Sequence, residues 1–333
     1  MKEMIEKAKC SLTKNVLELT IPELLEDDEK IIDLKEFEYC PADMLDILQE
    51  LGWEYMIKNF IITGDCHGGM GVVNRAGNIN RNMPNFTPTE TAIIILGDSG
   101  LNFWLNKTDK KYKKLSCVYG YTFYCVRGNH EERPENLGYQ VEYDPNVDGA
   151  VYVDKDFPQI RYFVDGNVYT LNNHKCLVVG GAYSVDKWYR LKRVEGTKEH
   201  PGWFPDEQLT EAEMRGIMNA TAGKEFDFVF SHTCPMAWEP RDLFINGIDQ
   251  SMVDKTMEVW MDKLKDNFTW KCWCFGHYHA DRIERPCVEQ FYNDYEDLEN
   301  VWNRWYDKET YCLEWWLPKS PYMEWWDLEN EKK

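Results

Sequence analysis

The side chains best suited to bind metal ions stand directly after short apolar runs of the sequence. They follow the runs FIIT, TAIIIL, FYCV, DFVF and KCWCF. The residues are Asp65, His67, Asp98, Asn129, His130, His232, His277 and His279. Five of the seven histidines of the chain belong to this set. Mixed ligation by carboxylate oxygen and imidazole nitrogen suits Mn, Fe, Zn or related divalent ions better than Mg or Ca, which prefer oxygen alone.

Two divalent cations held about 3.5–4 Å apart would explain why both residue types occur. A bridging carboxylate offsets the repulsion between the cations, and neutral imidazoles keep the site from becoming too anionic. Such a pair can clamp a phosphoryl group and produce hydroxide from bound water near neutral pH. The chemistry that these residues favour is therefore metal-assisted hydrolysis.

The apolar runs are rich in β-branched and aromatic residues and end in glycine or polar residues, which is typical of buried strands. Helix-like stretches lie between several of them, for example PDEQLTEAEMRGIMNA and DQSMVDKTMEVWMDKL. Strands that alternate with helices predict an α/β fold. Ligands of open α/β sheets bind at the carboxyl ends of the strands, where we expect the metal-binding side chains to meet.

The motifs GDCHG, GD, GNHE, SH and GHYH occur in this order between Asp65 and His279. In this they resemble the calcineurin-like metallophosphoesterase superfamily, of the bacterial and phage type related to the Ser/Thr protein phosphatases. The resemblance implies a four-layer α/β/β/α sandwich with two mixed β-sheets. It also implies a single metallophosphoesterase domain over residues 1–333, with a catalytic core at about 59–287. An acidic helical flank (1–58) and a Trp-rich acidic cover (288–333) would complete that domain.

The resemblance also implies a ligand set. One metal ion would be held by Asp65, His67, Asp98 and His279. The second would be held by Asp98, Asn129, His232 and His277, with Asp98 as the bridge. His130 would lie beside the substrate as a catalytic and substrate-binding residue, and Glu131 would orient a neighbouring group. The implied reaction is in-line attack on a phosphate ester by metal-bound hydroxide, without a covalent phosphoenzyme.

The second motif departs from the protein phosphatase pattern, because GDSGLNF lacks the aspartate and arginine found there. This puts protein phosphatase activity in doubt. Arg127, in RGNHE, could bind substrate phosphate as a bidentate donor or form a surface salt bridge. In GGAYSVDKWYR, Asp186, Lys187 and Arg190 could line the substrate entrance or belong to a solvated loop.

Two other readings of the motifs involve different chemistry. Cys272 and Cys274, beside His277 and His279, could form a local zinc site, although the spacing lacks the usual long loop between ligand pairs. We expect instead that both cysteines are buried on one face of a strand. GDSG at 97–100 also resembles the nucleophile motif of chymotrypsin-like serine proteases, but Ser99 is more simply a turn residue.

Composition limits the function further. The chain has 333 residues and a net charge of −20, which disfavours long nucleic acids and anionic membranes as partners. Eleven irregularly spaced cysteines, no signal peptide and no membrane-spanning run favour the cytoplasm. We therefore expect a dinuclear phosphoesterase, favouring monoesters, that acts on a phosphorylated small molecule or phosphopeptide. The alternatives are a phosphodiesterase for small nucleotides and a binding or scaffold protein that uses the Trp-rich tail.

Overall fold

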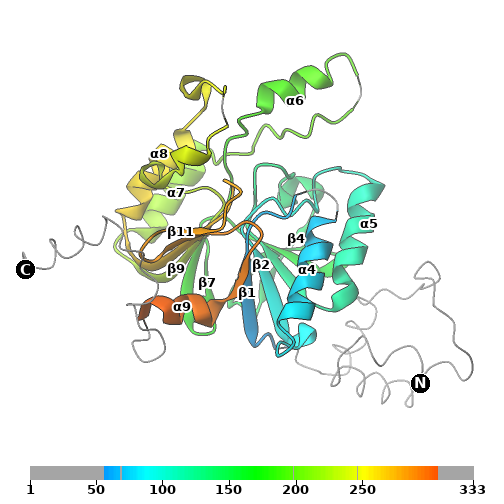
Figure 1. Cartoon of the computed structure of the whole chain (residues 1–333), viewed down its shortest axis with the longest axis vertical. Helices are drawn as coiled ribbons and strands as arrows, with labels where there is room; N and C mark the ends of the chain where they lie inside the picture. The colour runs from blue at the N-terminus through cyan, green and yellow to red at the C-terminus, as the bar shows by residue number, and fades with distance from the viewer. Residues whose placement is uncertain (1–55, 68–69, 198, 246, 307–333) are drawn as a thin grey trace, which may run out of the picture. The chain divides into compact units, whose positions relative to one another are not determined.

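The computed structural model describes residues 56–67, 70–197, 199–245 and 247–306 of the chain (Figure 1). The chain divides into two compact units, Met1–Asp297 and Leu298–Lys333. In the second unit the described element is helix α9 (Leu298–Tyr306), in which the rings of Trp302 and Tyr306 stack. All further elements belong to the first unit.

The first sheet has four parallel strands at its centre and antiparallel strands at its edges. Its strands, in spatial order, are β13 (Tyr295–Asp297), β1 (Asn59–Thr63), β2 (Thr91–Ile95), β3 (Thr122–Cys125), β6 (Phe157–Phe163), β5 (Gly149–Asp154) and β4 (Gln140–Asp144). Every residue of β2 is buried, as expected for a central strand covered on both faces. The parallel strands β1, β2 and β3 bring their carboxyl ends to one edge of this sheet.

The second sheet repeats this plan with a parallel centre and antiparallel edges. Its strands, in spatial order, are β11 (Arg282–Arg285), β12 (Val288–Gln290), β10 (Thr269–Phe275), β9 (Glu225–Ser231), β8 (His174–Val179) and β7 (Val168–Leu171). The carboxyl ends of β8, β9 and β10 therefore also share one edge.

Helices pack on one face of each sheet. Ile93 and Ile95 of β2 pack with Val72, Ala76 and Ile79 in one apolar cluster. The helices on this side are α4 (Gly71–Asn82) and α5 (Lys107–Ser116). The second sheet forms a separate apolar cluster with α7 (Glu211–Thr221) and α8 (Thr256–Lys265). The remaining helices are α6 (Lys187–Arg193) and the 3-10 turns η2 (Pro88–Glu90), η3 (Cys117–Tyr119), η4 (Pro134–Leu137), η5 (Met236–Trp238), η6 (Arg241–Leu243) and η7 (Gln250–Met252).

The two sheets meet through the faces that carry no helices. Phe163 of β6 contacts Tyr169 of β7 with ring centroids 4.4 Å apart, and it stacks on Tyr124 of β3. The Tyr169 hydroxyl donates to the Ala150 carbonyl of β5 at 2.7 Å. Helices, sheet, sheet and helices thus form four layers, and the predicted α/β/β/α class with two mixed sheets is confirmed.

The five apolar runs that precede the candidate metal-binding residues are the strands β1, β2, β3, β9 and β10. The two helix-like stretches contain the helices α7 and α8. Each helix begins several residues after the start of its stretch. Thr210 fixes the start of α7, because its side chain accepts from the Glu213 amide in a capping box. Most of the acidic helical flank (1–58) and most of the Trp-rich tail (288–333) lie outside the described residues. The extent of the single domain stays a prediction.

Among the helices of the described ranges, none combines the length and apolar character that a bilayer crossing would require.

Candidate metal centre

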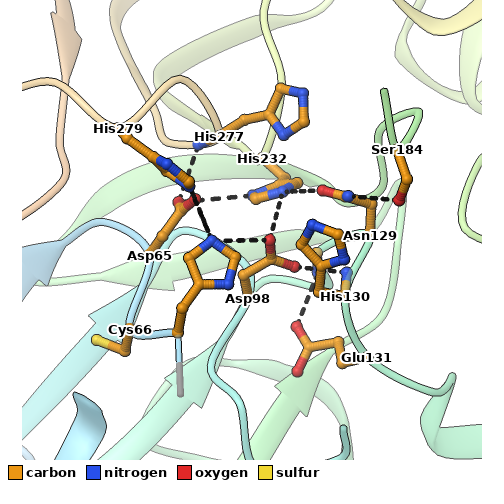
Figure 2. A network of polar contacts seen from close by, with 12 residues as sticks. Asp65, Cys66, Asp98, Asn129, His130, Glu131, Ser184, His232, His277 and His279 are labelled. Atoms are coloured by element: carbon orange, nitrogen blue, oxygen red, sulfur yellow. Dashed lines mark hydrogen bonds and ion pairs between the residues drawn. The ribbon is translucent and has the colours of Figure 1, made fainter. Parts of the chain in front are cut away.

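The polar side chains at the strand ends of both sheets meet in one network (Figure 2). Asp65 follows β1, Asp98 follows β2 and Asn129 follows β3, all from the first sheet. His232 follows β9 and His279 follows β10, both from the second sheet. Segments separated by more than 200 residues in sequence therefore contribute to the same site.

The first candidate ligand group contains Asp65, His67 and His279. The two Nε2 atoms of His67 and His279 are 2.8 Å apart. Asp65 Oδ2 lies 3.4 Å from His67 Nε2 and 3.2 Å from His279 Nε2. Asp65 Oδ1 accepts from the backbone N–H of His277, so Oδ2 is the oxygen that faces the imidazoles.

The second candidate group contains Asp65, Asp98 and His232, all of them buried. Asp98 Oδ2 lies 3.4 Å from His67 Nε2 and 3.6 Å from His232 Nε2, which places it between imidazoles that come from the two sheets. Asp98 Oδ1 accepts from the backbone N–H of His130 at 2.7 Å. The two groups share Asp65, whereas Asp98 belongs to the second group alone, so the bridging role of Asp98 stays a prediction.

The hydrogen bonds around His232 test whether a cation fits. His232 Nδ1 lies 2.8 Å from the Leu96 carbonyl oxygen, which can only accept, so Nδ1 carries a proton. In the neutral imidazole the lone pair of Nε2 then faces Asn129 Oδ1 at 2.8 Å and Asp98 Oδ2 at 3.6 Å. Three acceptor atoms that face one another repel unless a cation lies among them. The donor set therefore fits a divalent ion of the Mn, Fe or Zn type.

The charges of the site favour a cation as well. Burial alone raises the pKa of Asp65, but contacts with His279, His67 and His232 outweigh it and hold this pKa well below its usual value. Burial opposes protonation of His67, yet Asp98 and Asp65 together raise its pKa to about 9. The two buried carboxylates thus attract positive charge, which a metal ion can supply in place of a proton.

The backbone at the site adopts conformations that are rare for residues with side chains. Asp98, His277 and His279 all have positive φ, at 48°, 69° and 53°. Such strain is concentrated at functional sites, where the surrounding structure maintains it. Gly97 and Gly128 allow close approach here, because a Cβ atom would lie 1.9 Å from His232 Nδ1 and 2.0 Å from Asp98 Oδ1, respectively.

Buried partners that the sequence did not indicate orient Asn129. Its Nδ2 donates to Ser184 Oγ at 2.8 Å, and Ser184 Oγ donates to Glu207 Oε2 at 2.5 Å. These two hydrogen bonds hold the Asn129 amide so that its Oδ1 faces His232. Ser184 ends the GGAYS stretch after β8, so its place at a strand end was a usable signal. Glu207 had none.

Glu131 holds together the loops after β2 and β3. Its carboxylate accepts from the Gly128 amide at 2.8 Å, from Ser99 Oγ at 2.7 Å and from the Tyr162 hydroxyl at 2.8 Å. The expected orienting role of Glu131 therefore has a structural counterpart. Ser99 is 1% exposed and contacts Glu131 and Tyr162, an environment that does not fit a protease nucleophile.

The imidazoles of His130 and His277 stand beside the two groups. The ring of His130 lies 5.3 Å from that of His67, and its Nδ1 is buried without a hydrogen-bond partner among the described residues. The ring of His277 packs against His232 at 4.9 Å, and burial lowers the His277 pKa to about 3. His277 belongs to neither group, so its role as a ligand stays a prediction.

Arg127 is buried, so the surface salt bridge considered for it is wrong. Its Nε donates to Asp165 Oδ2 at 3.0 Å and its Nη1 donates to the Glu207 carbonyl at 2.7 Å. The guanidinium is 3% exposed, and its Nη2 is buried without a hydrogen-bond partner among the described residues, so the role of Arg127 in substrate binding stays a prediction. Cys272 and Cys274 are buried in β10, and neither joins a candidate group within the described residues.

Residues 58–281 match the family model described as calcineurin-like phosphoesterase, and the chain belongs to this family. The family is one of metal-dependent phosphoester hydrolysis. A search of curated proteins found no match. Among solved structures, the chain is similar to the crystal structure of TT1561 of Thermus thermophilus. The identity is 11%, the TM-score is 0.39, and the alignment covers 73% of this chain and 98% of the other.

Proposed function

We propose that the protein hydrolyses phosphate monoesters with two divalent cations held by the strand-end cluster. The observation that carries the proposal is the convergence of acceptor atoms from Asp65, His67, Asp98, His232 and His279. Bound there, the cations would neutralise charge on the phosphoryl group and lower the pKa of a water molecule. Asn129 Oδ1 and the ring of His277 would complete the ligand set.

In this proposal His130 is the group that acts on the substrate, and two observations support it. The bond between its amide and Asp98 fixes its backbone, and its partner-free Nδ1 leaves the imidazole available to a ligand. Hydrolysis forms a bond between the water oxygen and phosphorus and breaks the bond between phosphorus and the leaving oxygen. In this proposal His130 donates a hydrogen bond or proton to that leaving oxygen.

Two alternatives concern the substrate and the class of function. The same cluster would serve a phosphodiesterase for small nucleotides, because metal ligation does not distinguish the two ester types. A net charge of −20 weighs against long nucleic acids as substrates. A scaffold function through the Trp-rich tail would rest on residues outside the described ranges.

The test is steady-state hydrolysis of p-nitrophenyl phosphate and of its bis ester by protein loaded with Mn²⁺. We expect the monoester to have the higher kcat/KM. His130→Ala should lower kcat/KM by about 10²–10⁴-fold, the range of general acid–base catalysis. Metal content, measured by plasma mass spectrometry, should stay at the wild-type level.

His174→Ala is the matched control, because His174 begins β8 at the strand end opposite to the one that carries the site. It should keep both metal content and kcat/KM. If metal-loaded wild-type protein hydrolysed neither ester, the proposed chemistry would be wrong. If His130→Ala were as active as the wild type, the role of His130 would be wrong.

A further inference from the structure

A cavity of about 290 Å³ lies near the metal centre, because the charge of Arg190 in its lining acts on His67 and His130, and it has no part in the proposed chemistry of that centre. We call it the α6 pocket. Its lining includes Phe103, Trp104, Tyr189, Arg190, Arg193 and His200. A volume near the lower end of the usual range for ligand sites suits one nucleotide and is too small for an oligonucleotide.

The walls of the α6 pocket are continuous with the site through short pieces of chain. Phe103 comes five residues after Asp98, so at most about 18 Å of backbone separates them. On the other side, Ser184 bonds to Asn129, and Asp186, two residues later, lines the pocket. A substrate whose phosphoryl group lies at the metal centre can therefore extend its leaving group into the pocket.

Two guanidinium groups give the pocket a local positive charge in an acidic protein. Arg190 is fixed by Asp186, which accepts from its Nε at 2.7 Å, and by the Gly202 carbonyl, which accepts from Nη1 at 3.1 Å. Its Nη2 has no partner among the residues that the structure describes. Arg193 makes no ion pair within the same residues. Both groups can bind an anion, because guanidinium suits phosphate geometry.

Exposed aromatic rings supply the second recognition element. Trp104 is 46% exposed and Tyr189 is 71% exposed, although both line the cavity. Large aromatic side chains left open at a concave site are stacking surfaces for planar ligands, and bases stack on them without sequence preference. Phe103 is covered in part by the Arg190 guanidinium, which lies 5.9 Å from its ring centroid.

We infer that the α6 pocket binds the leaving group of the substrate, and that this leaving group is a nucleoside carrying a second phosphate. The base would stack on Trp104 and Tyr189, and the second phosphate would bind Arg193 and the open side of Arg190. The inference rests on the proposed function, because it assumes that the first phosphate reacts at the metal centre. A phosphotyrosine peptide would supply the ring but not the second phosphate that two arginines call for.

The test compares kcat/KM for adenosine 3′,5′-bisphosphate, a phosphotyrosine peptide and p-nitrophenyl phosphate on the Mn²⁺-loaded full chain. We expect the bisphosphate to be the best substrate. Arg193→Ala should lower the ratio of kcat/KM for the bisphosphate to that for p-nitrophenyl phosphate by about tenfold or more, since a charge-assisted contact is lost. Lys192→Ala removes the same charge from the same helix outside the pocket lining, and its ratio should equal that of the wild type.

Equal ratios in Arg193→Ala and Lys192→Ala, or a phosphotyrosine peptide as the best substrate, would overturn the inference while leaving the proposed chemistry intact. If the wild type hydrolysed none of the three compounds, the proposed function would fail. In that case, calorimetric titration of the protein with adenosine 3′,5′-bisphosphate would test whether the α6 pocket binds this ligand, independently of hydrolysis. Binding that Arg193→Ala weakens and Lys192→Ala does not would support the pocket, and equal affinities would refute it.

Discussion

At the scale of single residues, the metal centre depends on side chains that lie one contact away from it. Thr233 directly follows His232 and donates from Oγ1 to Glu258 Oε1 at 2.8 Å. The same hydroxyl contacts the hydroxyl of Tyr278, the residue between His277 and His279 in the sequence, at 3.1 Å. Glu258 of α8 is 3% exposed, so a carboxyl group buried in the second sheet's helical layer supports both histidine-bearing loops.

Glu258 should make stability depend on pH. Burial raises its pKa to about 7, although the bond from Thr233 lowers it. Because the folded state then binds a proton more tightly than the unfolded state, the contribution of Glu258 to the free energy of unfolding is largest below about pH 4.5 and is lost as pH rises through about 7. Urea unfolding at pH 5 and pH 8 should show a loss on the order of 3 kcal/mol from this group.

In Glu258→Gln that part of the pH dependence should disappear, whereas exposed Glu211→Gln should keep the wild-type dependence. Identical pH profiles for Glu258→Gln and the wild type would show that this carboxyl group is ionised in the folded protein.

At the scale of elements, the site depends on glycines that let neighbouring strand ends approach. Gly128, after β3, packs against the carboxylate of Asp98, which follows β2. A Cβ atom at Gly97 or Gly276 would likewise meet a side chain of the site, His232 or Asp65, which accounts for the glycine before three of the candidate residues, Asp98, Asn129 and His277. Contacts of this kind are set by the pairing of β1, β2 and β3 in parallel.

Gly128→Ala should therefore weaken metal binding without removing a ligand. The added Cβ would lie 2.0 Å from Asp98 Oδ1, so the loop or the carboxylate has to move. We expect the dissociation constant for Mn²⁺, measured by calorimetry, to rise about tenfold or more. Gly216→Ala is the control, because its Cβ meets no atom within 4 Å on helix α7.

Gly216→Ala should stabilise the fold by about 0.5–1 kcal/mol through its helix propensity and should leave Mn²⁺ affinity unchanged. Equal Mn²⁺ affinities in Gly128→Ala and Gly216→Ala would mean that the approach of these strand ends does not position Asp98.

The elements also show which parts of the structure the sequence could predict. Runs such as TAIIIL are almost entirely apolar, because central parallel strands are buried on both faces, and β1, β2, β3, β9 and β10 were recognisable by this pattern. The parallel strand β6 (FPQIRYF) was not, because polar residues interrupt its apolar ones. Edge strands such as β4 (QVEYD) carry exposed and polar residues, so no comparable pattern marks them. The meeting of Asp65, His67, Asp98, His232 and His279 could be predicted from their residue types and their positions at strand ends, and their binding of metal stays a prediction. Glu207 and Glu258 act through contacts formed only on folding, and the sequence pattern around them contains no sign of that.

At the scale of the whole molecule, the two sheets contribute different ligands to one centre. Asp65 and Asp98 come from the first sheet, and His232 and His279 come from the second. Cations bound to the two candidate groups would connect layers that otherwise meet through aromatic packing and backbone contacts. Such an ion binds the folded chain only, since the ligands are far apart in an unfolded chain.

The most direct test is anomalous diffraction from crystals soaked in Mn²⁺. For a dinuclear centre we expect two peaks about 3.5–4 Å apart, with Asp98 between them and with Asp65 and His232 within ligand distance. Crystals of Asp98→Asn should lose at least one peak. A wild-type map with no peak near Asp98, or with a single peak bound by Cys272 and Cys274, would contradict a dinuclear centre at the strand ends.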